Sequence, residues 1–537
     1  MPKLPWWKTG VVYQIYPRSF ADSDGDGTGD LRGVISRLDY LNDGTLMSLG
    51  VDAIWLSPFF HSPGYDFGYD VSDYCAIDPL FGTMADFDEL VREAHRRGIR
   101  VVLDLVLNHT SHLHSWFVES RSSRENPKRD WYIWQDPGQL GGPPNNWQSM
   151  FGGRAWKWDA KSRQYYFHMF LEEQPDLNWR NPETRRAVMD VFRFWLDRGV
   201  DGFRLDVVNA YFKDSMLRSN PPALGIRGYE RQRHLYDKDQ PELPGAYREI
   251  RSILDSFGGR MDVGEMMGGM TEAVRYGKDG LLSLAFNFDF TNQRWNPRGF
   301  LKSIEEYERA LAGDGWPCYV LSNHDIARHA SRYGGRRAEA RAKVAAAMLL
   351  TLRGTPFLYN GEEIGMRNGP IRRSELRDPV GVKYWPLPVG RDGCRTPIPW
   401  NASPGAGFTT GTPWLPINPD YREVNVASQL EDPDSVLSFY RKMIWLRKKT
   451  PALQIGDFRA AGKPSSRAMA YLRETKTQTV LVALNFFESA CDLAFREPLP
   501  VGSWRLLLST HSPDGAQSPA NGSVHLRPNE AAVWERR

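Results

Sequence analysis

The sequence has few cysteines and no long hydrophobic run. Its 537 residues include only Cys75, Cys318, Cys394 and Cys491, which lie far apart and form no Cys-X-X-Cys pair. This spacing predicts buried free thiols in a reducing compartment rather than a disulfide framework. No run of 18 apolar residues and no apolar leader near the N-terminus is present, so we expect a cytoplasmic protein without a membrane-spanning segment.

The sequence also lacks an excess of either charge. Its 68 basic and 65 acidic residues give a net charge of +3, and no long basic run occurs. A protein that binds nucleic acid or a membrane surface usually carries a basic patch, so we expect neither partner. Apolar residues make up 41% of the chain. A chain of this length is expected to bury a large core and to fold into two or three compact units.

Short apolar runs alternate with amphipathic stretches along most of the chain. Thr83 and Asp86 have the spacing of a capping box, an apolar face follows at helical spacing, and Gly98 ends that predicted helix. A buried strand comes directly after it. The eight strands that we predict are Val11–Phe20, Val51–Phe59, Ile99–Asn108, Val200–Asp206, Asp262–Glu265, Ser283–Phe290, Tyr319–Asp325 and Thr355–Asn360. Repeated helix–glycine–strand units indicate a parallel α/β architecture.

Several predicted strands end abruptly in polar, potentially reactive residues, as in LVLNH, FRLD, VGE and VLSNHD. In a closed α/β barrel these carboxyl ends form one active site. We therefore predict a (β/α)8 barrel made of residues 1–108 and 175–455. An inserted subdomain is expected at 109–174, a second insertion at about 366–425 after the eighth strand, and a C-terminal antiparallel β-sandwich domain at 456–537.

Three acids at separate strand ends suggest glycoside chemistry. Asp206, Glu265 and Asp325 stand in DGFRLDVVN, DVGEMM and LSNHDIAR. Retaining cleavage of a glycosidic bond needs a nucleophilic carboxylate and an acid/base carboxyl about 5 Å apart, which strand ends of one barrel can supply. Arg204 lies two residues before Asp206, so its side chain points to the same side of the strand and can keep Asp206 ionised.

The motifs together resemble the alpha-amylase family of glycoside hydrolases. DLVLNHT, GFRLDVV, VGE and SNHD are similar to its four signature segments, in the same order. QPDLN resembles a fifth segment of its alpha-glucosidase and oligo-1,6-glucosidase branch. The opening VVYQIYPRSFADSDGDGTGDLRGV and the later GRDGCRTPIPW extend the resemblance over nearly the whole chain.

The resemblance implies a role for each matching residue. Asp206 would be the nucleophile and Glu265 the general acid/base, while Asp325 would bind sugar hydroxyls and favour the distorted ring. His109 and His324 would donate hydrogen bonds to the glucose that is transferred. Tyr69 would stack beneath that glucose.

Two further residues bear on which glycosides enter the site. The resemblance implies that Asp66 and Arg391 pair and hold the 4-hydroxyl of a terminal glucose, which closes the pocket behind one sugar. A bidentate carboxylate–guanidinium pair is suited to this task. Arg395 lies close to Arg391 in the sequence, so either arginine could reach the sugar. Phe151, in the first insertion, is a candidate wall on the acceptor side.

An acidic loop follows the first predicted strand. Its acidic residues recur at every second place with glycines between them, a pattern that can wrap a hard cation with carboxylate and carbonyl oxygens. Related glucosidases bind calcium or magnesium there, so the resemblance implies a structural, non-catalytic divalent cation. The ligands that we predict are Asp22, Asp24, Asp26, Thr28 and Asp30.

These observations lead us to expect a retaining, exo-acting alpha-glucosidase, a monomer or homodimer, that acts on small alpha-glucosides and also transfers glucose to hydroxyl acceptors. The resemblance gives two opposing indications of linkage. Val207, the residue after the nucleophile, favours cleavage of alpha-1,6 links, whereas GRDGCRTPIPW and WPCYVLSNHD favour maltose-type substrates. We expect maltose-type substrates. The alternatives are an oligo-1,6-glucosidase and a predominant glucosyltransferase. Trp147, Tyr211 and Phe212 could line the acceptor side. An inactive scaffold remains a remote alternative, because such chains usually lack a catalytic acid.

Overall fold

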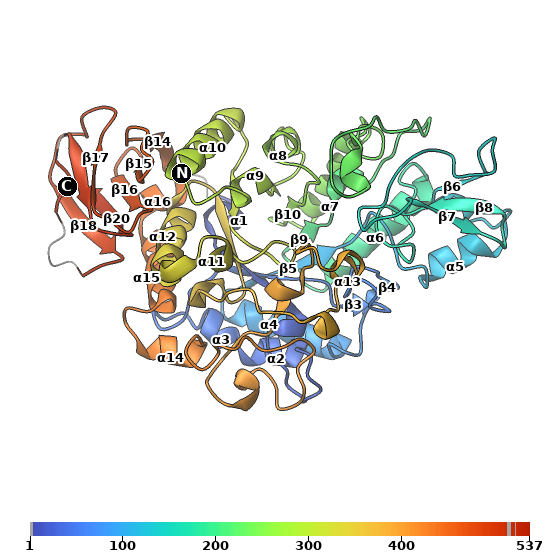
Figure 1. Ribbon diagram of the computed structural model, residues 1–537, viewed down its shortest axis with the longest axis horizontal. Helices are drawn as coiled ribbons and strands as arrows, with labels where there is room; N and C mark the ends of the chain where they lie inside the picture. Colours follow the sequence, from blue (N-terminus) through green and yellow to red (C-terminus); the bar gives the residue numbers. More distant parts are fainter. Residues whose placement is uncertain (1–3, 513–516, 521) are drawn as a thin grey trace.

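Eight parallel strands in chain order form the central sheet of the computed structural model (Figure 1). The structure describes residues 4–512, 517–520 and 522–537. The strands are β1 (Val12–Ile15), β2 (Ala53–Leu56), β5 (Arg100–Leu105), β9 (Gly202–Leu205), β10 (Met261–Gly264), β11 (Leu284–Ala285), β12 (Cys318–Val320) and β13 (Thr355–Tyr359). They pair in the order β11-β10-β9-β5-β2-β1-β13-β12. This order confirms the predicted barrel. Seven of the predicted strands are present in a shorter form, and the predicted Asp262–Glu265 is present with the same length, shifted by one residue to Met261–Gly264.

Helices between the strands cover the outside of the barrel. The longer ones are α4 (Met84–Arg96), α6 (Pro182–Asp197), α7 (Leu243–Ser256), α10 (Pro297–Ala310), α12 (Ala338–Thr351) and α15 (Val436–Lys449). Short helices are α1 (Trp6–Thr9), α2 (Leu31–Ser36), α3 (Leu38–Leu41), α8 (Met270–Tyr276), α9 (Phe288–Thr291), α11 (His329–Arg332), α13 (Pro379–Tyr384), α14 (Val426–Glu431) and α16 (Pro451–Ile455). Thr83 and Asp86 form the predicted capping box of α4. Reciprocal capping satisfies two otherwise unpaired N–H groups, which fixes where this helix begins.

A small antiparallel unit follows β5 and projects from one end of the barrel (Figure 1). It contains α5 (Ser115–Ser122) and the sheet β6-β8-β7, whose strands are Trp134–Gln135, Gln164–Phe167 and Trp156–Asp159. A short hairpin of β3 (Phe60–His61) and β4 (Asp73–Ile77) precedes it. The unit thus lies where an insertion after the third strand was expected.

The C-terminal region is an antiparallel β structure at the opposite end of the molecule (Figure 1). Its five-stranded sheet has the order β14-β15-β16-β20-β18, and β17 pairs with β19. The strands are β14 (Asp457–Ala460), β15 (Ala468–Glu474), β16 (Thr479–Asn485), β17 (Cys491–Ala494), β18 (Trp504–Ser509), β19 (Ser523–Leu526) and β20 (Ala531–Arg536). Residues from both sheets share one hydrophobic cluster.

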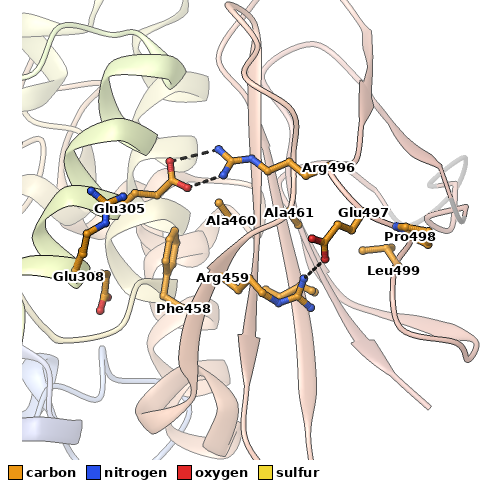
Figure 2. A pocket seen from close by; sticks show the side chains of 12 residues that line it. Glu305, Glu308, Phe458, Arg459, Ala460, Ala461, Arg496, Glu497, Pro498 and Leu499 are labelled. Atoms are coloured by element: carbon orange, nitrogen blue, oxygen red, sulfur yellow. Dashed lines mark hydrogen bonds and ion pairs between the residues drawn. The ribbon is translucent and has the colours of Figure 1, made fainter. Parts of the chain in front are cut away.

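A pocket of about 380 Å³ lies between this C-terminal domain and α10 (Figure 2). Arg496 pairs there with Glu305 of α10 at 2.6 Å, and Arg459 pairs with Glu474 at 2.9 Å. The Arg496–Glu305 pair joins the C-terminal domain to the barrel, whereas Arg459 pairs within the C-terminal domain.

All four cysteines are free thiols, as predicted. Cys318 and Cys394 are buried, but Cys75 is exposed and Cys491 is half-buried, so the prediction that all four are buried is wrong for these two. Cys75 lies on β4, on the opposite side of the strand from the buried Tyr74. Within the described residues, none of the helices is long and apolar enough to cross a membrane.

Candidate active site

A pocket of about 400 Å³ opens at the carboxyl ends of the barrel strands. The structure brings eight of the ten predicted catalytic and substrate residues to its wall: Asp66, Tyr69, His109, Phe151, Asp206, Glu265, Asp325 and Arg391. Arg204 and His324 lie directly behind them. Val207, which was expected to influence linkage preference, also lines the pocket, as do residues without a predicted role, among them Met150, Phe170, Arg227, Met266, Met267, Phe288, Asn323, Ile326, Val380 and Val389. The pocket therefore has a polar end with the three acids and a large apolar wall.

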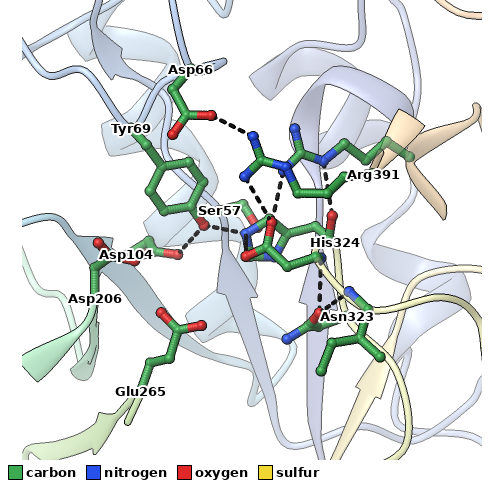
Figure 3. Close-up of polar contacts among 12 residues, drawn as sticks. Ser57, Asp66, Tyr69, Asp104, Asp206, Glu265, Asn323, His324 and Arg391 are labelled. Carbon is green, nitrogen blue, oxygen red and sulfur yellow. Dashed lines mark hydrogen bonds and ion pairs between the residues drawn. The ribbon is translucent and has the colours of Figure 1, made fainter. Parts of the chain in front are cut away.

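Arg204 is the centre of the acidic end. Its Nη1 donates to Asp206 Oδ1 at 2.8 Å and to Asp104 Oδ1 at 2.7 Å, while its Nη2 donates to Glu265 Oε2. The guanidinium is 1% exposed, so its charge is screened little by water. One buried cation thus holds the nucleophile candidate and the acid/base candidate at neighbouring strand ends. Asp104, the first residue of the DLVLNHT segment, had no predicted role of its own and completes this cluster. Figure 3 shows it with Asp206 and Glu265.

Burial and neighbouring charges act in opposite directions on the proposed nucleophile. Burial raises the pKa of Asp206 well above its ordinary value, Arg204 opposes this effect, and the charges of Glu265 and Asp104 add to it. The Arg204 guanidinium is therefore the group that favours the ionised form of Asp206.

The backbone is strained immediately after Asp206. Val207 has φ 35° and ψ 47°, in the left-handed region that a β-branched residue rarely adopts. Its N–H points toward Glu265 Oε2 at 3.5 Å, and Val208 N donates to Glu265 O at 3.0 Å. Strain of this kind persists only where surrounding contacts enforce it. Here it turns the chain so that the ends of β9 and β10 stay together.

Asp325 is surrounded by positive charge. Burial alone would raise its pKa, but neighbouring positive charge, including the guanidinium groups of Arg391 and Arg395, outweighs burial and holds the pKa of Asp325 well below its usual range. Arg395 Nη2 donates to Asp325 Oδ1 at 2.8 Å and Arg391 Nη1 donates to the same oxygen at 3.2 Å. Asp325 is consequently an ionised acceptor throughout the neutral range.

The structure distinguishes the two arginines that the sequence left open. Arg391 lines the pocket, and its Nη2 donates to Asp66 Oδ1 at 2.7 Å. Arg395 is completely buried and its Nε donates to His324 O at 2.8 Å, so it supports the site from behind. Phe151 lies beneath the Arg391 guanidinium at 5.0 Å. The two insertions therefore meet at the pocket through this cation–π contact.

Both predicted histidines are neutral. Burial lowers the pKa of His109 to about 4 and that of His324 to about 3. The Tyr69 hydroxyl lies 2.5 Å from His324 Nε2 and donates to Asp104 Oδ2 at 3.1 Å, which connects His324 with the Arg204 cluster (Figure 3). Gln174, from the QPDLN motif, lies within hydrogen-bond distance of His109 Nε2 at 3.2 Å. Gln174 had no predicted role of its own; its place in that motif was the only signal.

Three aromatic residues do not take the places suggested for them. Trp147, Tyr211 and Phe212 are buried and do not line the pocket. Tyr211 stacks on Trp179 with ring centroids 4.3 Å apart, and the Trp147 indole donates to Arg218 O at 2.9 Å. They belong to the core because packing against neighbouring aromatics excludes them from the cavity. The apolar wall of the pocket is instead formed mainly by methionine, valine, isoleucine and phenylalanine side chains.

The acidic loop after β1 brings three carboxylates together. Asp22, Asp24 and Asp30 each offer one oxygen within 4.8 Å of the others. Asp26 Oδ1 instead accepts the Thr28 N–H at 2.7 Å. Hydrogen bonds from Thr409 and backbone N–H groups overcome the opposing effect of burial and lower the pKa of Asp22. The loop thus brings carboxyl oxygens of three residues to one point, and within the described residues Asp26 does not join that cluster.

Comparisons with known proteins agree with the geometry. A family model described as the catalytic domain of alpha amylase matches residues 14–456. The chain is 45% identical over 506 residues to a probable alpha-glucosidase of Rhizobium meliloti, covering 91% of each chain. It is 40% identical over 567 residues to an oligo-1,6-glucosidase of Parageobacillus thermoglucosidasius, covering 99% of each. The solved structure of an alpha-glucosyl transfer enzyme matches 100% of both chains, with a TM-score of 0.92 and 42% identity.

Proposed function

The chain belongs to the alpha-amylase family of glycoside hydrolases, and we propose that its pocket removes one terminal alpha-linked glucose from small oligosaccharides with retention of configuration. The observation that carries this proposal is the junction at Arg204, which binds Asp206 and Glu265 from adjacent strands at the floor of one pocket. A pair of carboxyls on the two sides of a scissile bond is what retaining hydrolysis requires.

In the first step, Asp206 attacks the anomeric carbon while Glu265 transfers its proton to the leaving oxygen. The aglycone departs as an alcohol or sugar, and a glucosyl ester remains on Asp206. In the second step, the Glu265 carboxylate takes a proton from water or from an acceptor hydroxyl, whose oxygen displaces Asp206. Two inversions give an alpha product. Arg204 stabilises the carboxylate that carries the charge at each stage, because both acids share its guanidinium.

The far end of the pocket fits a single terminal sugar. Asp66 and Arg391 form an ion pair at 2.7 Å, and Arg391 also contacts Asp325. A glucose bound above Asp206 would meet this pair with its 4-hydroxyl, so a longer chain could not continue in that direction. Exo-acting cleavage follows from this closure.

The acceptor side is expected to accept either water or an organic hydroxyl. Its wall includes Met267, Ile326, Val380 and Val389, which offer contact surface but few hydrogen-bond partners. Several linkages can therefore be accommodated, and maltose is the substrate that we expect first, with isomaltose as the alternative. Free thiols support a cytoplasmic location, and the proposal includes a monomer or homodimer.

A product time course with maltose and, separately, isomaltose tests the linkage preference. We expect glucose to form faster from maltose, and added alcohol to yield a new alpha-glucoside beside free glucose. Glucose from isomaltose alone would reassign the enzyme as an oligo-1,6-glucosidase despite the same mechanism. New glucosides that outpace free glucose would make it chiefly a transferase. With a longer malto-oligosaccharide as substrate, the release of internal fragments in amounts equal to glucose would contradict exo action.

We further propose that the loop after β1 holds a structural divalent cation, calcium or magnesium. The donor set fits, because Asp22, Asp24 and Asp30 converge, and hard cations prefer carboxylate and carbonyl oxygens. Gly27 has φ +96° and lies against the backbone of Thr412, where a Cβ would fall 1.8 Å from the carbonyl oxygen. A bound cation would therefore fix this loop against the second insertion. It would supply charge neutralisation and take no part in bond cleavage.

Removal of this cation should lower the thermal stability of the protein more than it lowers the rate of glycoside cleavage. We expect EDTA to lower the melting temperature by several degrees, with recovery on addition of Ca²⁺ or Mg²⁺, since a ligand bound only to the folded state stabilises it by mass action. Asp24→Asn should remove most of this response, whereas Asp43→Asn, in an exposed turn outside the loop, should leave it intact. A wild-type melting temperature that is unchanged by EDTA and by either cation would contradict the proposed site.

A further inference from the structure

Asp378, in the second insertion, binds the Arg391 side chain and backbone but does not itself line the pocket. Its Oδ1 accepts from Arg391 Nε at 3.0 Å and from Arg391 Nη2 at 2.7 Å. Its Oδ2 accepts the backbone N–H of Arg391 at 2.8 Å. Asp378 is 0% exposed and is absent from the pocket wall. One carboxylate therefore fixes both the backbone and the guanidinium of the residue that faces the sugar.

The position of Asp378 is itself fixed by the local fold. It is the N-cap of α13, and its Oδ2 accepts from Gly381 N at 3.3 Å. Its own backbone N–H donates to Asp392 Oδ2 at 2.9 Å, and Gly390 approaches Gly381 so closely that a Cβ there would fall 2.8 Å from the Gly381 Cα. The two chain segments that carry Asp378 and Arg391 are thus held together by the bonds between these two residues, by the bond from Asp378 to Asp392 and by the close approach of the two glycines.

An arginine at the wall of a pocket needs such support. Its long side chain has several rotamers, and holding it in one costs about 1.5–2 kcal/mol of conformational entropy. Without Asp378, Arg391 could turn wholly toward Asp66 or Asp325, since both are already within 3.2 Å of it. Asp378 occupies the Nε edge of the guanidinium, and the outer edge faces Asp66 and Asp325, where a ligand would bind. This division of the five donors defines one orientation.

We propose that Asp378 is a positioning residue that determines specificity for a terminal glucose, acting through the orientation of Arg391. The inference rests on the proposed function, because it concerns the end of the pocket that closes behind one sugar. Asp378 touches no substrate. Its effect is expected on recognition of the 4-hydroxyl rather than on the chemistry at Asp206.

The test compares p-nitrophenyl alpha-glucoside with its 4-deoxy analogue on wild type and on Asp378→Ser. Serine is a good N-cap, so it keeps an acceptor for the Gly381 N–H while it removes the carboxylate from Arg391. For wild type we expect the 4-deoxy substrate to lose about 10- to 100-fold in kcat/KM, as for a hydrogen bond to charged groups. For Asp378→Ser we expect a loss of about threefold or less, with KM for the parent glucoside raised more than kcat is lowered.

Asn425→Ser provides the matched control. Asn425 is a buried N-cap in the same insertion, it caps α14 through Ser428 N, and it does not line the pocket. This variant should retain the full 4-deoxy penalty. If Asp378→Ser fails to fold, the double variant Asp378→Asn/Arg391→Ala is compared with the single variant Arg391→Ala. The inference predicts that their kcat/KM values differ by less than about twofold.

Three outcomes are informative. A 4-deoxy penalty in folded Asp378→Ser equal to that of wild type would overturn the inference and leave Asp378 a purely structural cap. A large effect of Asp378→Asn in the Arg391→Ala background would overturn it as well, because the residue would then act without Arg391. A wild-type protein that hydrolyses neither glucoside would contradict the proposed function itself, which separates that failure from a failure at Asp378.

Discussion

Asp206→Asn should abolish turnover of maltose, with a fall in kcat of at least about 10⁴-fold, as for other enzymes that lose their nucleophile. The amide cannot form the glucosyl ester on which both steps depend. The fold should persist, since asparagine has nearly the same volume and can still accept a hydrogen bond from Arg204. Steady-state kinetics with maltose, together with a melting curve, measure the two effects separately.

Asp214→Asn is the matched control for that substitution. Asp214 lies eight residues further along, is 4% exposed and pairs with Arg218 at 2.8 Å, outside the pocket wall. Its loss should cost some stability but leave kcat within about threefold of wild type, because the carboxylate has no place in the chemistry. An Asp206→Asn protein that turns over at a rate near that of wild type would refute the assigned nucleophile.

Glu265→Gln should separate substrates by their leaving groups. Loss of a general acid typically costs about 10²- to 10⁴-fold, and we expect a loss in this range with maltose, whose leaving sugar needs a proton. A p-nitrophenolate leaves without one, so the first step with p-nitrophenyl alpha-glucoside should be nearly normal. The second step should then be slow, because no base activates water, and a burst of nitrophenolate should precede slow turnover.

The measurement is a stopped-flow trace of nitrophenolate beside the steady-state rate with maltose. Azide needs no general base, so it should restore turnover of the aryl substrate by attacking the glucosyl ester of Asp206. An equal loss in the first step on both substrates, with no burst and no azide rescue, would be incompatible with an acid/base role for Glu265. Arg204 would then be holding a structural carboxylate.

Much of this fold could be predicted because the informative patterns are local. Each barrel strand is a short apolar run that stops at a polar residue, and helices such as α4 begin at recognisable caps. The three acids could be found because each stands at such a strand end. The domain boundaries inferred from composition stay predictions, since packing at domain edges is not a local property of the sequence.

Contacts between distant segments could not be predicted. Asp104 and Arg204 are 100 residues apart and meet only because β5 and β9 are neighbours in the sheet. The pairing of Asp378 with Arg391 depends on a close approach of two loop segments in the second insertion. Likewise, Trp147 is buried because it packs against other aromatic residues in the first insertion. Composition alone does not predict which way a side chain in such a segment points.

The most direct test of the account is the anomeric form of the first glucose released from p-nitrophenyl alpha-glucoside, which yields only one glucose, followed by proton NMR before mutarotation equilibrates it. The Arg204-linked pair of Asp206 and Glu265 predicts alpha-glucose as the initial product, which later converts in part to the beta form. Beta-glucose as the initial product would mean single displacement by water. That result would contradict a covalent intermediate on Asp206 and the mechanism built on it.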